Sequence, residues 1–183
     1  MKKIIWKIQI TKAPAAVKYC KRCGSKTEFM SSGLFRVNAQ QKNLDVWLIY
    51  KCTACDTTWN LTILSRVNPC SIPTETLHQF HENNFELAVQ YAADINLVKK
   101  NGAEPCIPEI EIHGEKVDFS VPTLLHLQPQ YPMAIKVSAL LRRELNLSRT
   151  EFDRLCDEGK ISCVSGQNLK KSKLSDEVII AIE

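Results

Sequence analysis

Apolar and polar residues alternate with a period of two over most of the first third of the chain. Four such runs are rich in β-branched and aromatic residues and are predicted to be strands, at residues 4–10, 34–38, 46–51 and 58–64. The opening residues 1–8 alternate and include Lys2, Lys3 and Lys7, and they are predicted to be an edge strand. A polar stretch at 39–43 predicts a hairpin loop between the second and third runs. This part of the chain is expected to form a small antiparallel β-domain.

Near residue 70 the apolar period changes from 2 to 3.6, which indicates helices. A short helix is predicted at about 74–82, and a longer helix follows. Asn83 and Glu86 resemble a capping box at its start, and Gly102 stands where a glycine cap ends a helix. The apolar stripe of the longer helix consists of Leu87, Ala88, Tyr91, Ala92, Ile95 and Val98.

Residues 103–132 contain five of the eight prolines and are predicted to be a connector with little regular structure. One hairpin is predicted in it, with 110–112 turning at His113 and Gly114 into 117–119. Two helices are predicted after residue 132, the second opened by a capping box of Ser148 and Glu151 and ended by Gly159. Short strands are predicted at 161–164, 169–171 and 178–182.

The chain is therefore predicted to be an α+β protein with three consecutive parts. Residues 1–70 form an antiparallel zinc-ribbon-like β-domain, residues 71–132 a helical segment with a proline-rich connector, and residues 133–183 a module of two helices and a small sheet. No apolar run approaches the roughly 20 residues of a membrane-spanning helix, and the start of the chain is too short and too lysine-rich for a signal peptide. We expect a cytoplasmic protein without a membrane partner, in which eight cysteines are not disulfides.

Charge is distributed unevenly along the chain. Residues 1–75 carry twelve Lys and Arg against four Asp and Glu, whereas residues 76–132 carry three against eight. The basic first segment favours an anionic partner.

Two Cys-x-x-Cys pairs are the strongest chemical signal in the sequence. Cys20 with Cys23, and Cys52 with Cys55, are separated by 28 residues, which leaves room for two strands and a loop. Two such turns supply four thiolates to one tetrahedral zinc ion per chain, and four thiolates close the shell against catalysis. Two disulfides, a redox pair or an iron–sulfur cluster are the alternatives.

The remaining histidines and cysteines give weaker signals. His78 and His81 share a helix face and, with Cys70 and either Cys106 or His113, are candidates for a second metal site, although two surface histidines are the favoured interpretation. The sequence has no phosphate-binding glycine loop, nucleophile elbow, His-Glu-x-x-His motif or clustered carboxylates. We predict no enzyme and no small-molecule substrate. The cysteines outside the two pairs are predicted to be buried small apolar residues, namely Cys70, Cys106, Cys156 and Cys163.

The last module contains a series of basic, apolar and turn residues, namely Lys136, Leu141, Ser148, Arg149, Leu155, Gly159, Lys160, Ile161, Gly166, Lys171 and residues 176–179. Through this series, residues 133–183 resemble the αL-motif RNA-binding domain named after ribosomal small-subunit protein S-four. The resemblance implies a contact with RNA by basic side chains, whereas Asp153, Asp157 and Glu158 leave the module nearly neutral. The implied RNA-binding residues are Lys136, Arg142, Arg143, Arg149, Arg154, Lys170, Lys171 and Lys173.

The whole chain also resembles an uncharacterised bacterial family, domain-of-unknown-function family one-zero-six-two, through the two cysteine pairs and residues 35–39. We predict a non-enzymatic zinc protein that binds ribosomal or transfer RNA, with the ribosome as a candidate partner. Trp47, Tyr50 and Trp59 either stack on bases or form the core of the β-domain, and the core is favoured. The alternative function is a zinc-ribbon regulator that binds protein or DNA, with the last module as a scaffold.

Overall fold

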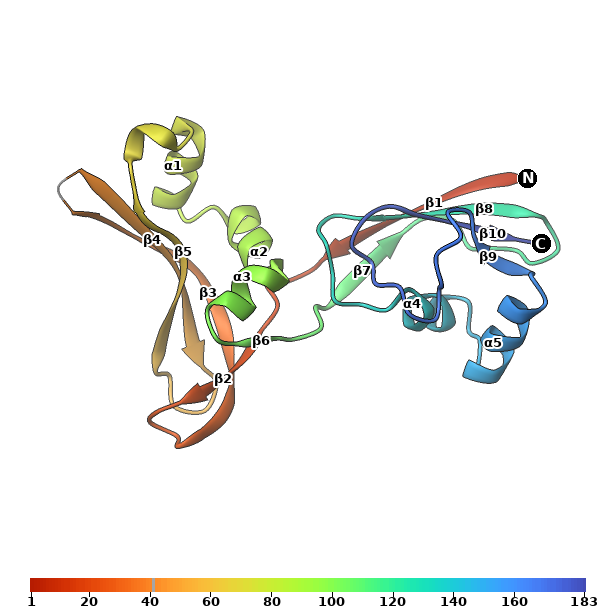
Figure 1. Ribbon diagram of the computed structural model, residues 1–183, viewed down its shortest axis with the longest axis horizontal. Helices are drawn as coiled ribbons and strands as arrows, with labels where there is room; N and C mark the ends of the chain where they lie inside the picture. The colour runs from red at the N-terminus through yellow and green to blue at the C-terminus, as the bar shows by residue number, and fades with distance from the viewer. Residues whose placement is uncertain (41) are drawn as a thin grey trace. The chain divides into compact units, whose positions relative to one another are not determined.

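Figure 1 shows the computed structural model, which describes residues 1–40 and 42–183. The chain divides into two compact units. We call Lys12–Glu109 the cysteine unit, and Met1–Thr11 together with Ile110–Glu183 the terminal unit. The α+β class is confirmed, since both units combine helices with a five-stranded sheet. The division differs from the predicted segments 1–70, 71–132 and 133–183, because the first strand pairs with strands that follow residue 109.

The sheet of the cysteine unit is antiparallel and has the strand order β5-β4-β3-β2-β6. Its strands are β2 (Ala16–Cys20), β3 (Ser25–Gln40), β4 (Asn43–Cys52), β5 (Thr58–Val67) and β6 (Glu104–Pro105). The strands predicted at 34–38, 46–51 and 58–64 are confirmed. In the predicted loop at 39–43, Gln40 pairs with Asn43, and Gln41 lies outside the described residues.

A short 3-10 turn, η1 (Pro69–Ser71), leads into α1 (Thr74–His81), which confirms the first predicted helix. The single longer helix was a wrong prediction, because the chain forms α2 (Phe85–Ala93) and α3 (Ile95–Lys100). Asp94 has extended backbone angles, and its carboxylate accepts hydrogen bonds from the N–H groups of Asn96 and Leu97, so it starts a new helix.

The cap of α2 is Asn84 and not Asn83, because the Asn84 side chain accepts the hydrogen bond of the Leu87 N–H. Asn83 has a left-handed backbone with φ 55°, and its side-chain oxygen accepts the Phe35 N–H at 2.7 Å. This contact ties the turn between α1 and α2 to β3. At the other end, the glycine cap is confirmed: Gly102 has φ 73°, and its N–H bonds the Lys99 carbonyl.

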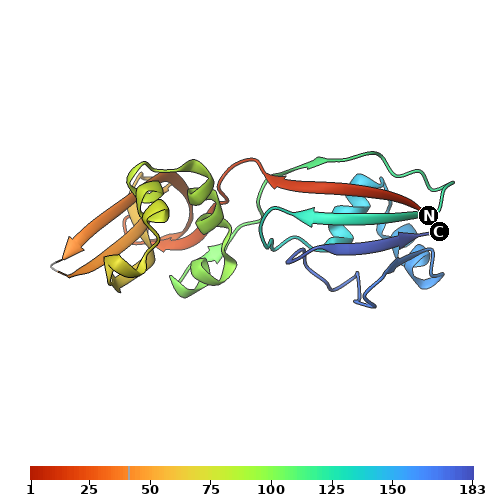
Figure 2. The ribbon, with the colours of Figure 1, turned by 90° about the horizontal axis from the view of Figure 1, so that it is seen from above.

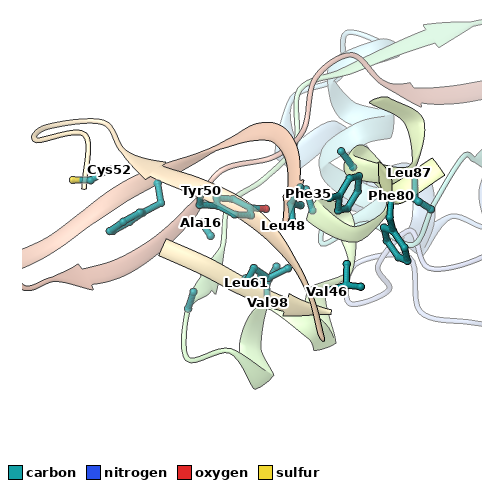
Figure 3. Packing of buried hydrophobic residues seen from close by; sticks show 14 of the residues in the cluster. Ala16, Phe35, Val46, Leu48, Tyr50, Cys52, Leu61, Phe80, Leu87 and Val98 are labelled. Carbon is teal, nitrogen blue, oxygen red and sulfur yellow. The ribbon is translucent and has the colours of Figure 1, made fainter. Parts of the chain in front are cut away.

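The core of the cysteine unit lies between the sheet and its helices (Figure 3). Phe80 of α1 lies edge-on to Phe35, with ring centroids 5.0 Å apart, and stacks on Tyr91 of α2 at 5.8 Å. Alternate residues of β4 point into the same cluster. The β4 residues in the core are Leu44, Val46, Leu48, Tyr50 and Cys52.

The terminal unit has a mixed sheet with the strand order β7-β1-β8-β10-β9. Its strands are β1 (Lys2–Ile10), β7 (Ile110–His113), β8 (Thr123–Pro129), β9 (Ile161–Cys163) and β10 (Val178–Ile182). Figure 2 shows β1 in red, β8 in turquoise and β10 in blue side by side. The edge-strand prediction for 4–10 was wrong, because β1 lies between β7 and a parallel neighbour, β8.

Three further predictions for the terminal unit were wrong. Residues 110–113 pair with β1 and not with 117–119, and the connector contains a full strand, β8. Residues 169–171 form a turn, in which the N–H groups of Lys171 and Ser172 both bond the Asn168 carbonyl.

The helices of the terminal unit are α4 (Val137–Glu144) and α5 (Arg149–Asp157). The capping box of Ser148 and Glu151 is confirmed in both directions. Among the described residues, no helix is long and apolar enough to cross a membrane.

Phe80 and Phe85 offer a matched test of this core. Phe80 is 1% exposed and Phe85 is 61% exposed. We expect Phe80→Ala to lower the free energy of unfolding of the cysteine unit by about 3–5 kcal/mol, because it removes a buried ring and leaves a cavity. Phe85→Ala should change it by less than about 1 kcal/mol. Chemical denaturation of both variants measures the difference, and equal effects would contradict the proposed packing.

Candidate metal centre

Each Cys-x-x-Cys pair occupies a tight turn between two strands. Cys20 ends β2, and the Gly24 N–H returns to the Cys20 carbonyl at 2.9 Å before β3 begins. Cys52 ends β4, and the Asp56 N–H bonds the Cys52 carbonyl at 3.0 Å before β5 begins. Gly24 and Asp56 both have left-handed backbones, with φ 68° and 59°. Each turn therefore closes on itself and directs two thiols to the same side.

The two turns lie at the same end of the sheet, because β2, β3, β4 and β5 are consecutive antiparallel neighbours. The four sulfur atoms consequently lie within 4.8 Å of one another. The sulfur of Cys20 is 3.5 Å from that of Cys55, and the sulfur of Cys23 is 3.9 Å from that of Cys52. All four are free thiols.

These spacings match a tetrahedral metal and not a disulfide. A metal with metal–sulfur bonds of about 2.3 Å holds its sulfurs about 3.8 Å apart, since a tetrahedron's edge is about 1.6 times its centre-to-corner distance. A disulfide joins its sulfurs at about 2.05 Å. The four cysteines can therefore hold one metal ion, as predicted from the sequence.

Hydroxyl groups of threonine residues prepare two of the thiols for metal binding. The Thr27 hydroxyl lies 3.3 Å from the Cys52 sulfur, and with the nearby backbone N–H groups it lowers the pKa of Cys52 to about 6. The Thr57 hydroxyl, 3.0 Å from the Cys55 sulfur, lowers the pKa of Cys55. A thiolate is the form that binds a metal, so both contacts favour coordination.

The pKa of Cys23 shifts in the opposite direction. Its hydrogen bond with the Cys55 thiol, followed by burial and by the other two sulfurs, raises the pKa of Cys23 to about 12. Four neighbouring thiolates repel one another, and a divalent cation removes this penalty.

Three basic residues near the site are engaged by groups other than the sulfurs. Lys18 donates to the carbonyls of Asn101 and Gly102 and lies 5.0 Å from the centre of the Trp59 ring. Lys51 pairs with Asp56, and Arg22 donates to the Cys55 carbonyl. The contacts of Lys51 and Arg22 involve residues of the two turns.

The other predicted ligands do not assemble. Among residues 1–40 and 42–183, the histidine, cysteine and acidic side chains that are arranged to hold a metal are those of Cys20, Cys23, Cys52 and Cys55. His78 pairs with Glu82 on the surface of α1. Contrary to prediction, Cys70 is exposed, and Cys106, Cys156 and Cys163 are only partly buried.

The eight basic residues proposed to contact RNA separate into two groups. Arg143, Arg149, Arg154 and Lys170 form ion pairs with acidic side chains of the terminal unit. The rest form no ion pair with any residue that the structure describes, and these are Lys136, Arg142, Lys171 and Lys173.

Two of the unpaired residues face each other. Lys136 caps the N-terminus of α4, and Lys173 is its antiparallel bridge partner. Partners across such a bridge point to the same side. We call Lys136 and Lys173 the lysine pair. Lys171 lies two residues away and is also exposed.

Comparison with known proteins identifies a family but no characterised relative. Residues 37–167 match the model of a family described as protein of unknown function (DUF1062). No curated protein and no solved structure matches the chain.

Replacing Cys52 tests the metal centre. Cys52→Ser keeps the size of the side chain but removes a thiolate with a lowered pKa, so we expect loss of bound metal and unfolding of the turns. Elemental analysis of protein purified under reducing conditions measures this. Cys156→Ala is the control, since Cys156 lies in the terminal unit, and it should keep all of its metal. Equal metal loss in both variants would show that the ligands are assigned wrongly.

Proposed function

The chain belongs to the DUF1062 family, and we propose that it is a non-enzymatic RNA-binding protein whose fold is stabilised by one zinc ion. The proposed RNA is ribosomal or transfer RNA. The observation that carries the proposal is the lysine pair, two cations held side by side without an acidic partner among the described residues.

Zinc is the proposed metal because the ligand set is four thiolates at tetrahedral spacing. Four thiolates leave no open coordination position, so the role of this ion is structural. Its binding energy adds directly to the folding energy of the two turns that it joins. We propose the name zinc ribbon for β2 to β5 on this basis.

The lysine pair supports a phosphate-binding surface. Like charges directly opposite each other on neighbouring strands destabilise a fold, and a bound phosphate removes this cost. The backbone N–H groups at the start of α4, where Lys136 is the cap, also favour an anion at this position. Lys171 adds a third unpaired cation close by in the chain.

The order of elements in the terminal unit supports RNA as the source of that phosphate. A helix, a second helix with a capping box, and two short antiparallel strands follow one another from residue 137 to residue 182. This is the order that the resemblance to the αL-motif RNA-binding domain implies.

A protein-binding or DNA-binding regulator is the second candidate. The observation that favours it is the neutralisation of α5, where Arg149, Arg154 and the neighbouring Lys170 are all paired with acidic groups. A helix with internally paired charge offers little attraction to RNA.

Removing the lysine pair tests RNA binding. We expect Lys136→Ala with Lys173→Ala to weaken binding to ribosomal RNA fragments and to lower the salt dependence, d log K/d log[salt], by roughly one to two, since two phosphate contacts are lost. The matched control is Lys160→Ala, because Lys160 is paired with Glu158, and its binding should be unchanged. Filter binding at several salt concentrations measures both. Unchanged affinity in the double variant would exclude this surface as the RNA site.

Arg149 tests whether α5 also contacts RNA. Its side chain is 82% exposed and only loosely paired with Asp153, at 3.8 Å. Arg149→Ala should weaken ribosome co-sedimentation and reduce the salt dependence by roughly one, while the cap of Ser148 and Glu151 survives. Glu158→Gln should leave binding unchanged or slightly stronger. If Arg149→Ala has no effect while Lys21 and Arg22 substitutions abolish binding, the cysteine unit is the RNA-binding module.

A further inference from the structure

The sheet of the cysteine unit has a second face, which the core does not use. On β3 and β4, Arg36 is paired with Trp47, and on β4 and β5, Trp47 is paired with Thr62 and Ile49 with Asn60. Cross-strand partners point to the same side of a sheet. We call Arg36, Trp47, Ile49, Asn60 and Thr62 the open face.

The core lies on the other side of these strands. Val46, Leu48 and Tyr50 alternate with Trp47 and Ile49 along β4, and Figure 3 shows their side chains in the cluster that also contains Phe80 and Val98. No residue of the open face belongs to that cluster or to the described residues that pack against it. The helices α1, α2 and α3 therefore cover one side of the sheet only.

Trp47 differs from the other two tryptophans. Trp6 is 4% exposed in the core of the terminal unit, and Trp59, which is partly buried, packs on Phe29 and Tyr50 against the core of the cysteine unit. Trp47 is half-buried on the open face, where the guanidinium carbon of Arg36 lies 5.8 Å from the ring centre. A large indole placed outside both cores, beside a cation, needs a reason other than packing.

The strands and the helices of the cysteine unit differ in charge. Residues 12–67, which form β2 to β5, carry nine Lys and Arg against three Asp and Glu. Residues 68–101, which contain α1, α2 and α3, carry four acidic residues against two lysines, Lys99 and Lys100. Arg36 is exposed and forms no ion pair among the described residues. Asp45, the acidic residue nearest in sequence to Trp47, accepts the Arg66 backbone N–H. A polyanion is thus attracted more strongly to the strands than to the helices.

We propose that the open face binds single-stranded nucleic acid, with a base stacked on Trp47 and a neighbouring phosphate on Arg36. An indole offers a flat surface to any base, and an adjacent guanidinium supplies the charge for the backbone. The side chains of Asn60 and Thr62 provide donors and acceptors for base edges. This inference extends the proposed RNA-binding function to a second site, in the cysteine unit.

Tryptophan fluorescence tests the proposal directly, because Trp47 is the tryptophan of the open face. Titration of the zinc-loaded protein with single-stranded oligonucleotides of about ten nucleotides should quench its emission. Trp47→Phe should lose the quenching, and Trp6→Phe and Trp59→Phe should keep it. Parallel titrations with RNA and with DNA of the same sequence show which of the two nucleic acids binds the open face.

Affinity measurements complete the test. We expect Trp47→Ala to weaken oligonucleotide binding by roughly 5- to 150-fold, the range for loss of one stacking contact. Arg36→Gln should lower the salt dependence by about 0.7. Arg36→Glu changes an exposed side chain and keeps Trp47, so this test does not require the fold to tolerate the loss of an indole. Bound metal at one ion per chain shows that each variant is folded. Folded Trp47→Ala and Arg36→Glu variants with unchanged affinity would overturn the proposal, as would a lack of quenching in the unmodified protein.

The two proposed sites can be tested independently of each other. The lysine pair lies in the terminal unit, so the Lys136→Ala, Lys173→Ala double variant should keep the quenching by short oligonucleotides. Lysine-dependent binding of ribosomal RNA without quenching would leave the proposed function standing and refute the open face. Quenching without lysine-dependent RNA binding would do the reverse.

Discussion

The arrangement of four thiols with their sulfurs within 4.8 Å of one another constrains the fold of the cysteine unit. Cys20 and Cys23 come from one hairpin turn and Cys52 and Cys55 from another, so the sulfurs meet only if the intervening strands keep their register. A slip of one residue in β4 moves every side chain to the opposite face of the sheet. It would carry Cys52 away from the metal and put Trp47 in place of Val46 in the core. The metal site and the division of the sheet into two faces are therefore one constraint.

That constraint explains how a small β-domain holds two chemically different surfaces. The covered face binds the helices through Phe35, Phe80 and Tyr91, whose rings meet at centroid distances of 5.0 to 6.3 Å. The edge strand β5 is protected by Asn101, whose side chain bonds both the N–H and the carbonyl of Thr62. The edge of β5 is thus paired at Thr62, a residue of the open face. Packing of the helices stabilises one side of the sheet, the proposed metal would add to this stability, and the other side is the open face.

Local patterns predicted the local structure well. The spacing of the cysteines, the capping box of Ser148 and Glu151 and the strands of the cysteine unit all depend on neighbours within one turn or one hairpin. The predictions that failed depend on partners far along the chain. The alternation of apolar and polar residues in β1 is the same for an edge strand and for an interior strand with helices on one side only. The parallel partner that makes β1 an interior strand is β8, which begins far along the chain, at Thr123. The break between α2 and α3 at Asp94 was harder to predict. The apolar stripe continues on both sides of Asp94, while the Asp94 carboxylate caps a new helix.

The aromatic residues of β4 and β5 show the same limit. Tyr50, Trp59 and Trp47 have equal propensity for strands, and the core was the favoured prediction for all three. Tyr50 lies in the core and Trp59 packs against it, whereas Trp47 lies on the other face. Trp47 and Tyr50 are three residues apart in one strand, so the alternation of side chains already places them on opposite faces. Which face the helices cover, and which residue of β5 lies beside Tyr50, depends on distant parts of the chain and cannot be inferred from one strand.

The two proposed nucleic-acid sites, carried on one chain, would have a physical advantage over either alone. The lysine pair is exposed and its attraction for a phosphate would be screened by salt, and one stacked base would contribute only a small part of a binding energy. The two proposed sites belong to different units of the same chain, so an RNA long enough to reach both would, once bound at one, meet the other at a raised effective concentration. An oligonucleotide too short to reach both sites gains nothing from this linkage. The difference in affinity between a long RNA and a short one would therefore measure cooperation between the two proposed sites.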